Sequence, residues 1–159
     1  MATIKYTDSK ADVQRMQIFL VDDDADDRAL FEEAFENVRA LSTDLTIFED
    51  GVSLLEYLRQ PENDLPHIIF LDLNMPMKSG VDCLREIRQD KRLRDVSVAI
   101  YSTSNSARDI EDTFSGGANV YIHKPSSFDQ LKKTLSHVLK LNWQFHLSGM
   151  NKETFFLNV

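Results

Sequence analysis

Six polar or charged side chains follow four apolar stretches of this chain, each at the point where the stretch ends. They are Asp22, Asp23 and Asp24 after IFLV, Asp72 after IIFL, Ser102 after VAIY and Lys124 after YIH. Continuous apolar runs of this length are typical of buried parallel strands. The carboxyl ends of parallel strands meet at one edge of a sheet, where open α/β sheets bind ligands, so we expect these side chains to converge.

The acidic members of this set predict a divalent metal site. Carboxylates a few ångströms apart repel one another, and without a cation between them at least one binds a proton at a raised pKa. Oxygen ligands with no Cys or His close in sequence favour Mg²⁺ or Mn²⁺ over Zn²⁺. An Asp beside such a metal can attack phosphorus and form an aspartyl phosphate. Lys124 and Ser102 would then neutralise and hydrogen-bond the phosphoryl oxygens.

Each of these residues has an ordinary structural interpretation when it is taken alone. An acidic triplet is common in turns, and Asp24 or Asp26 can cap a following helix. Asp72 can cap the turn after its strand, Ser102 can bond to the local backbone, and most lysines are solvated. The joint spacing of all four segments favours a site.

Five short runs rich in β-branched and aromatic residues predict the strands that position this site. They cover residues 18–21, 45–48, 68–71, 96–100 and 119–122. Their starts lie 23 to 28 residues apart, which is the length that a strand, a helix and two loops require. The segments between them carry apolar residues at helical spacing, as in Leu30, Phe31, Ala34, Phe35 and Val38. Gly116 and Gly117 suit the end of one such helix. The pattern predicts a three-layer α/β domain.

Length and composition limit the classes of protein to consider. The chain has 159 residues, 42% hydrophobic and 28% charged, which fits one globular domain. Its lone cysteine, Cys83, excludes an internal disulfide. A net charge of −8 disfavours nucleic-acid binding, and the basic cluster at 91–94 is too short to supply it. We expect a soluble cytoplasmic protein with no membrane partner, because no apolar stretch approaches about 18 residues and no secretory signal precedes the domain.

The two ends of the chain fall outside the strand and helix repeat. We expect residues 1–16 to be flexible, residues 17–140 to form the domain, and residues 141–159 to form a C-terminal extension. The extension contains four large aromatic residues, more than a solvent-exposed tail usually has: Trp143, Phe145, Phe155 and Phe156. Two interpretations are open. Either the last helix continues and packs on its own domain, or the extension is a docking surface for a homodimer or another partner.

Four segments resemble the motifs of response regulator receiver domains. They are VDDD at 21–24, FLDLNMP at 70–76, YSTS at 101–104 and YIHKP at 121–125. The intervals of 30 residues from Asp72 to Ser102 and 22 from Ser102 to Lys124 are also similar. The likeness spans about residues 17–140. It implies a flavodoxin-like, three-layer (βα)5 fold with a central parallel five-stranded sheet.

The resemblance also implies a role for each matching residue. Asp72 corresponds to the phosphoacceptor, and Asp22, Asp23, Asp72 and the backbone carbonyl of Asn74 to the metal ligands. Ser102 and Lys124 correspond to the hydroxyl and the lysine that assist phosphotransfer. Ser102 and Tyr121 correspond to the switch pair, and Lys124–Pro125 to a cis peptide bond. Asp24 has no corresponding role.

Three departures from the family pattern stand out. Position 102 holds Ser where Thr is commoner, which keeps the hydroxyl. Val96-Ser97-Val98 lacks a proline often found before the fourth strand. The chain beyond Leu141 exceeds the minimal domain and resembles the extended C-termini of phytochrome-associated single-domain regulators.

The function we expect is that of a single-domain response regulator in a two-component system or phosphorelay. A sensor histidine kinase or phosphotransfer protein would phosphorylate Asp72 with Mg²⁺ (or Mn²⁺) bound, and the phosphoprotein would present a changed surface to a downstream protein. It would not be an enzyme, beyond assisting its own phosphorylation and dephosphorylation. One alternative is a Mg²⁺-dependent phosphohydrolase, but the general acid that such enzymes place two residues after the nucleophile is Asn74 here. Another is a binding module that works without phosphorylation.

Overall fold

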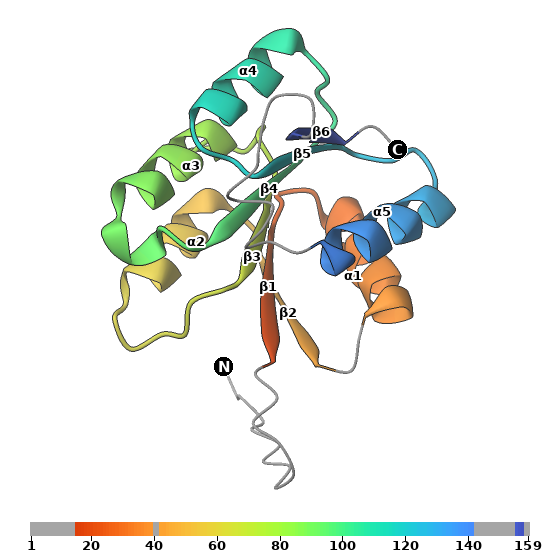
Figure 1. Ribbon diagram of the computed structural model, residues 1–159, viewed down its shortest axis with the longest axis horizontal. Helices are drawn as coiled ribbons and strands as arrows, with labels where there is room; N and C mark the ends of the chain where they lie inside the picture. The colour runs from red at the N-terminus through yellow and green to blue at the C-terminus, as the bar shows by residue number, and fades with distance from the viewer. Residues whose placement is uncertain (1–14, 40–41, 142–154, 158–159) are drawn as a thin grey trace, which may run out of the picture.

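The computed structural model describes residues 15–39, 42–141 and 155–157, which form a parallel sheet with helices on both faces (Figure 1). The order of the strands in the sheet is β2-β1-β3-β4-β5-β6. The strands are β1 (Met16–Val21), β2 (Thr43–Phe48), β3 (Ile68–Leu71), β4 (Ser97–Ser102), β5 (Val120–His123) and β6 (Phe156–Leu157). The helices are α1 (Ala25–Val38), α2 (Gly51–Arg59), α3 (Gly80–Gln89), the short 3₁₀ helix η1 (Lys91–Leu93), α4 (Ala107–Ser115) and α5 (Phe128–Lys140).

The first five strands confirm the flavodoxin-like fold class, and their bounds differ from the predicted runs by a few residues. β1 begins at Met16, and β4 extends through Ser102, so this serine ends its strand instead of following it. All four residues of β3 are buried, as expected for a strand covered on both faces. The sixth strand, β6, was not predicted and adds a short parallel partner at the outer side of β5.

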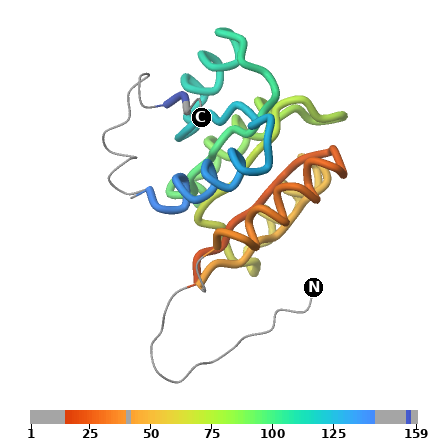
Figure 2. The backbone as a smooth tube through the Cα atoms, turned by 90° about the vertical axis from the view of Figure 1, so that its right-hand side faces the viewer, coloured from red at the N-terminus to blue at the C-terminus, as the bar shows by residue number. Residues whose placement is uncertain are grey.

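Two apolar cores lie on opposite faces of the sheet. One contains buried side chains of α1 and α5, such as Phe31 and Leu135, and Figure 2 shows these two helices side by side. The other lies under α2, α3 and α4 and includes Leu54 and Ile87. Burial of side chains on both faces is the main stabilising contribution in a three-layer domain of this kind.

Local capping interactions set the ends of the helices. Asp24 is the N-cap of α1, and its carboxylate accepts a hydrogen bond of 3.0 Å from the Asp27 N–H. Of the two caps considered from the sequence, the structure therefore selects Asp24. At the end of α4, Gly116 is the C-cap and Gly117 has a φ of +94°, a conformation that favours glycine.

The peptide bond before Pro125 corrects one expectation from the family resemblance. The described residues contain no cis peptide bond, so Lys124–Pro125 is trans. The trans isomer is the intrinsically favoured one before proline, by about 0.5–1 kcal/mol. With this bond trans, the backbone N–H of Lys124 donates a 2.8 Å hydrogen bond to the Ser102 carbonyl, and the lysine still reaches the acidic side chains described below.

The C-terminal extension is described only in part. α5 ends at Lys140, and Leu141 has an extended conformation, so a direct continuation of this helix, one of the two interpretations left open, is not found at Leu141. Trp143 and Phe145 lie outside the described residues, as do residues 1–14. Phe155 is fully buried, and β6 pairs with β5 through Tyr121 and Phe156. Each helix in the described ranges falls short of the length and apolarity that crossing a bilayer requires.

Candidate functional site

Three carboxylates gather at the carboxyl edge of the sheet, between β1 and β3. One oxygen from each of Asp22, Asp23 and Asp72 lies within 4.8 Å of the others. The register explains this proximity, because Val21 pairs with Leu71 and the Asp72 N–H donates a 3.0 Å hydrogen bond to the Val21 carbonyl. The ends of the two strands are therefore level, and the predicted convergence of these acidic residues is found.

The Lys124 ammonium lies among these carboxylates. Its Nζ is 2.9 Å from Asp22 Oδ2 and 3.7 Å from Asp72 Oδ2, and its side chain is only 8% exposed. A third carboxylate, Asp27, accepts a hydrogen bond of 2.9 Å from the same nitrogen. Burial by itself lowers the pKa of Lys124, but the hydrogen bond to Asp27 and the negative charges of Asp22 and Asp72 outweigh it and raise the pKa above its usual value. The lysine therefore stays charged.

Asp72 is the carboxylate with the most unusual ionisation. Its burial raises its pKa to about 7, against the opposing attraction of Lys124 and with a further increase from Asp22. Its Oδ1 accepts a 2.9 Å hydrogen bond from the Leu73 N–H. At neutral pH, a proton and a cation therefore compete for this group.

The geometry around Asp22 fits a bound cation. Its Oδ1 accepts a hydrogen bond of 3.0 Å from the Asp24 N–H. Its Oδ2 is buried and, although close to Lys124 Nζ, makes no hydrogen bond of acceptable geometry with any described residue. A buried carboxylate oxygen without a hydrogen bond is costly. A cation bound by Asp22, Asp23 and Asp72 would give that oxygen a ligand and relieve the repulsion between the three acids.

The loop before α3 also depends on this edge. Asn74 lies in that loop, two residues after Asp72, and is exposed. Where the loop enters α3, a Cβ on Gly80 would lie 2.2 Å from the Asp72 carbonyl oxygen and 2.8 Å from the Leu73 Cα. Only glycine permits this close approach of α3 to the end of β3, so Gly80 helps to position Asp72.

The two expected switch residues meet at the loop after β4. Ser102 and Tyr121 are both fully buried. The Ser102 hydroxyl oxygen accepts a 3.1 Å hydrogen bond from the Ser104 N–H, and the Tyr121 hydroxyl donates one of 2.7 Å to the Ser104 carbonyl. Both side chains are therefore linked to the backbone of one residue, Ser104.

Sequence reasoning missed one residue of the site, Asp27. It lies in the first turn of α1, three residues after the N-cap Asp24. Its carboxylate forms an ion pair with Lys124, which is remote from it in the sequence. The available signal was its position, because a helix that begins at the acidic edge directs its first turn toward that edge.

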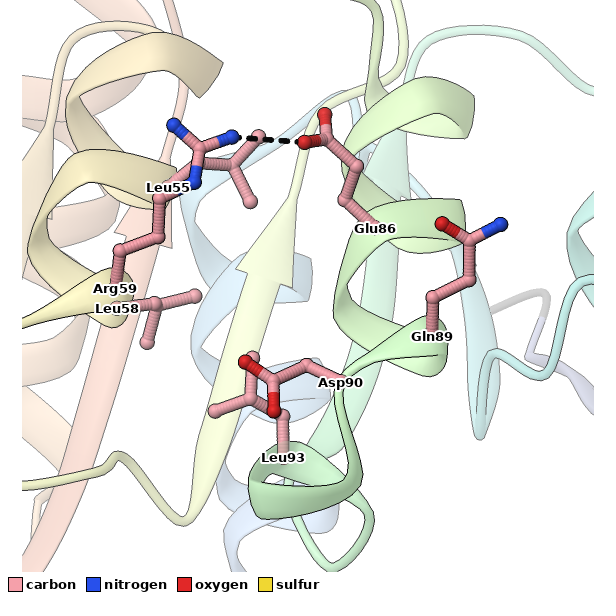
Figure 3. Close-up of a pocket in the computed structure, with 7 residues that line it drawn as sticks. All are labelled: Leu55, Leu58, Arg59, Glu86, Gln89, Asp90 and Leu93. Atoms are coloured by element: carbon pink, nitrogen blue, oxygen red, sulfur yellow. Dashed lines mark hydrogen bonds and ion pairs between the residues drawn. The ribbon is translucent and has the colours of Figure 1, made fainter. Parts of the chain in front are cut away.

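A small pocket lies elsewhere, between α2 and α3, and has no part in this site. It is lined by Leu55, Leu58, Arg59, Glu86, Gln89, Asp90 and Leu93, and a 2.8 Å ion pair joins Arg59 to Glu86 at its rim (Figure 3). Its lining includes none of the residues that gather at the carboxyl edge.

Fold and site together define a flavodoxin-like domain with an acidic, metal-compatible carboxyl edge. The chain belongs to the response regulator receiver domain family, whose model matches residues 18–136. Receiver domains are signalling domains of two-component systems, are phosphorylated on aspartate, bind a divalent metal, and interact with histidine kinases or phosphotransfer proteins and with downstream targets. The match confirms the family resemblance that the four sequence motifs indicated.

Individual relatives support the same assignment. The chain is 34% identical over 131 residues to the probable methanogenesis regulatory protein FilR2 of Methanothrix harundinacea, covering 79% of this chain and 84% of that protein. It is 30% identical over 125 residues to the response regulator Rcp1 of Synechocystis, covering 76% and 84%. The crystal structure of the phosphorylated cyanobacterial phytochrome response regulator RcpA superposes with a TM-score of 0.74 at 32% identity, covering 86% of this chain and 97% of that one. The Mn²⁺-bound form of Rcp1 gives 0.71 at 27% identity, with the same coverage.

Proposed function

We propose that this protein is a response regulator that accepts a phosphoryl group on Asp72 from a sensor histidine kinase or a phosphotransfer protein. The observation that carries the proposal is the set of three carboxylates within 4.8 Å of one another, with Lys124 beside them. Asp72 is buried and is the acid of this set that directly follows the central strand β3. A carboxylate in this position can act as a nucleophile toward phosphorus.

The transfer is a single displacement. An Asp72 carboxylate oxygen attacks phosphorus and forms the new O–P bond. The P–N bond of the donor phosphohistidine breaks, and its electron pair remains on the imidazole nitrogen. Lys124 and the Ser102 hydroxyl stabilise the charge that spreads over the phosphoryl oxygens.

Asp22, Asp23, Asp72 and the Asn74 carbonyl are the proposed ligands of Mg²⁺, with Mn²⁺ as a substitute. When bound, the cation would neutralise charge on both the carboxylates and the incoming phosphoryl group. The donor set contains oxygen only, which favours these hard cations. The closeness of the three carboxylates, with one oxygen of each within 4.8 Å of the others, supports the same assignment.

The proposed output is a change of surface on the face formed by α4, β5 and α5. Ser102 would turn inward toward the phosphoryl group and change its hydrogen bond with Ser104, and Tyr121 would follow inward because it bonds to the same residue, so phosphorylation would favour the buried position of Tyr121. We propose residues 17–140 as the receiver domain, acting in the cytoplasm through a protein partner, without nucleic acid or membrane. A homodimer through residues 141–159 belongs to the same proposal.

Incubation with acetyl phosphate and Mg²⁺ tests this function. We expect the intact mass of the protein to rise by one phosphoryl group and to return after removal of the donor. The Asp72→Asn variant should stay unmodified, whereas Asp95→Asn, an exposed acid distant from the site, should be labelled like the wild type. Labelling of Asp72→Asn would place the phosphoacceptor at another residue and refute the assignment.

A further inference from the structure

The described end of the C-terminal extension contacts the expected switch residue Tyr121. Phe155 is fully buried, and its ring centroid lies 5.2 Å from that of Phe114 on α4 and 6.2 Å from that of Tyr121. Phe156 lies 5.7 Å from Tyr121 by the same measure. Together, the two phenylalanines cover the tyrosine from the side of α4 and β5.

Backbone pairing fixes this segment in register with β5. In β6, Phe156 pairs with Tyr121 and Leu157 with Ile122, in parallel orientation. β6 is the last strand of the sheet, and Figure 1 shows it beside β5. Without it, the outer side of β5 would present unpaired backbone groups. Residues 155–157, which we call the C-terminal segment, therefore dock by both hydrogen bonds and aromatic packing.

A short chain of contacts connects the C-terminal segment to the phosphorylation site. Tyr121, which it covers, donates a hydrogen bond of 2.7 Å to the Ser104 carbonyl. The Ser104 N–H in turn donates to the hydroxyl oxygen of Ser102 at the carboxyl edge. Tyr121 thus contacts both the loop that leads to the proposed phosphorylation site and the C-terminal segment.

The sign of the coupling follows from the space that Tyr121 occupies. Its ring is fully buried under Phe155 and Phe156, with the hydroxyl directed to Ser104. If the ring turned outward, it would enter the volume filled by these two side chains. A docked C-terminal segment and an outward Tyr121 therefore exclude each other, and docking favours the buried position that phosphorylation is proposed to select.

We propose that the C-terminal segment is an intramolecular ligand of the α4–β5 face that holds Tyr121 buried and so strengthens binding of a phosphoryl group at Asp72. The inference rests on the proposed function. Linkage makes the effect reciprocal, so phosphorylation must tighten docking of the segment by the same factor. The surface that a downstream protein binds then includes the C-terminal segment itself.

Beryllofluoride, a phosphoryl mimic, provides the test. Its affinity for the full chain in Mg²⁺ is measured by titration with ¹⁹F NMR, for the wild type, Phe155→Ala and the conservative variant Phe155→Leu. We expect Phe155→Ala to bind at least about five-fold more weakly, the lower end of typical coupling between sites, and Phe155→Leu to recover part of the loss. The control is Tyr57→Ala, which removes an aromatic ring that also has two ring partners but lies on α2. It should bind like the wild type.

The reciprocal measurement follows docking directly. Amide hydrogen exchange at Phe156 and Leu157 should slow when beryllofluoride is added to the wild type. Equal or tighter binding by Phe155→Ala, or exchange that does not change, would refute the coupling alone. A wild type that does not bind beryllofluoride would refute the proposed function and the coupling with it. A coupling that disappears on dilution would assign the docked segment to another copy of the chain and overturn the intramolecular proposal.

Discussion

Replacing Asp27 with asparagine measures what the extra carboxylate on Lys124 does to the site. Lys124 Nζ lies at an equal distance of 2.9 Å from Asp27 and Asp22, and farther from Asp72. To bind a phosphoryl group on Asp72, the ammonium has to give up part of this interaction. Asp27 also adds a negative charge near an incoming anion. Both effects weaken phosphoryl binding, so Asp27→Asn should strengthen it.

The magnitude follows from the distance and the exposure of the pair. Two unit charges 2.9 Å apart attract by roughly 6 kcal/mol at an effective dielectric constant of about 20. Desolvation and solvent screening offset most of this, because the Asp27 side chain is 34% exposed. Pairs of this kind contribute about 1 kcal/mol net. That free energy corresponds to about a five-fold change in affinity.

The assay is the beryllofluoride titration, together with the rate of phosphorylation by acetyl phosphate at several donor concentrations. Asp27→Asn should bind beryllofluoride about five-fold more tightly and be phosphorylated faster at low donor concentration. Asp26→Asn is the matched control, because Asp26 is an exposed acid in the same first turn of α1 and reports the general effect of charge there. Equal or weaker binding by Asp27→Asn would refute the reasoning and would mean that Asp27 positions Lys124 for the phosphoryl group.

Further predictions concern ionisation and packing at the same edge. Because the pKa of Asp72 is raised to about 7 and a metal ligand must be ionised, Mg²⁺ affinity measured by calorimetry should rise as the pH increases from 6 to 8, and a flat profile would contradict this. A folded-state pKa above the unfolded value means that ionisation of Asp72 destabilises the fold. Without divalent cations, Asp72→Asn should therefore exceed the wild type in unfolding free energy by roughly 4 kcal/mol at pH 8, and the difference should nearly vanish by pH 4 in urea titrations. Gly80→Ala should cost about 1–3 kcal/mol of stability, because its Cβ meets the backbone of Asp72, and an unchanged urea midpoint would show that the helix can move.

Much of the fold was predictable because its signals are local. Continuous apolar runs and helical stripes depend on residues close in sequence, and they located five of the six strands found among the described residues, together with the parallel architecture. β6 was missed because a pair of phenylalanines near the end of the chain carries no strand pattern. Its pairing depends on the open side of β5, which exists only after the domain has folded.

The candidate site was also predictable only where its signals are local in the sequence. The amino-acid sequence by itself determined which strand ends carry Asp22, Asp72, Ser102 and Lys124, since parallel strands deliver their carboxyl ends to one edge. Only the tertiary structure decided that Lys124 pairs with Asp27, which is 97 residues away in the chain, and that Phe155 covers Tyr121. The physical reason is that ion pairs and ring contacts depend on distances of a few ångströms between segments remote in sequence, and packing of the whole domain sets those distances.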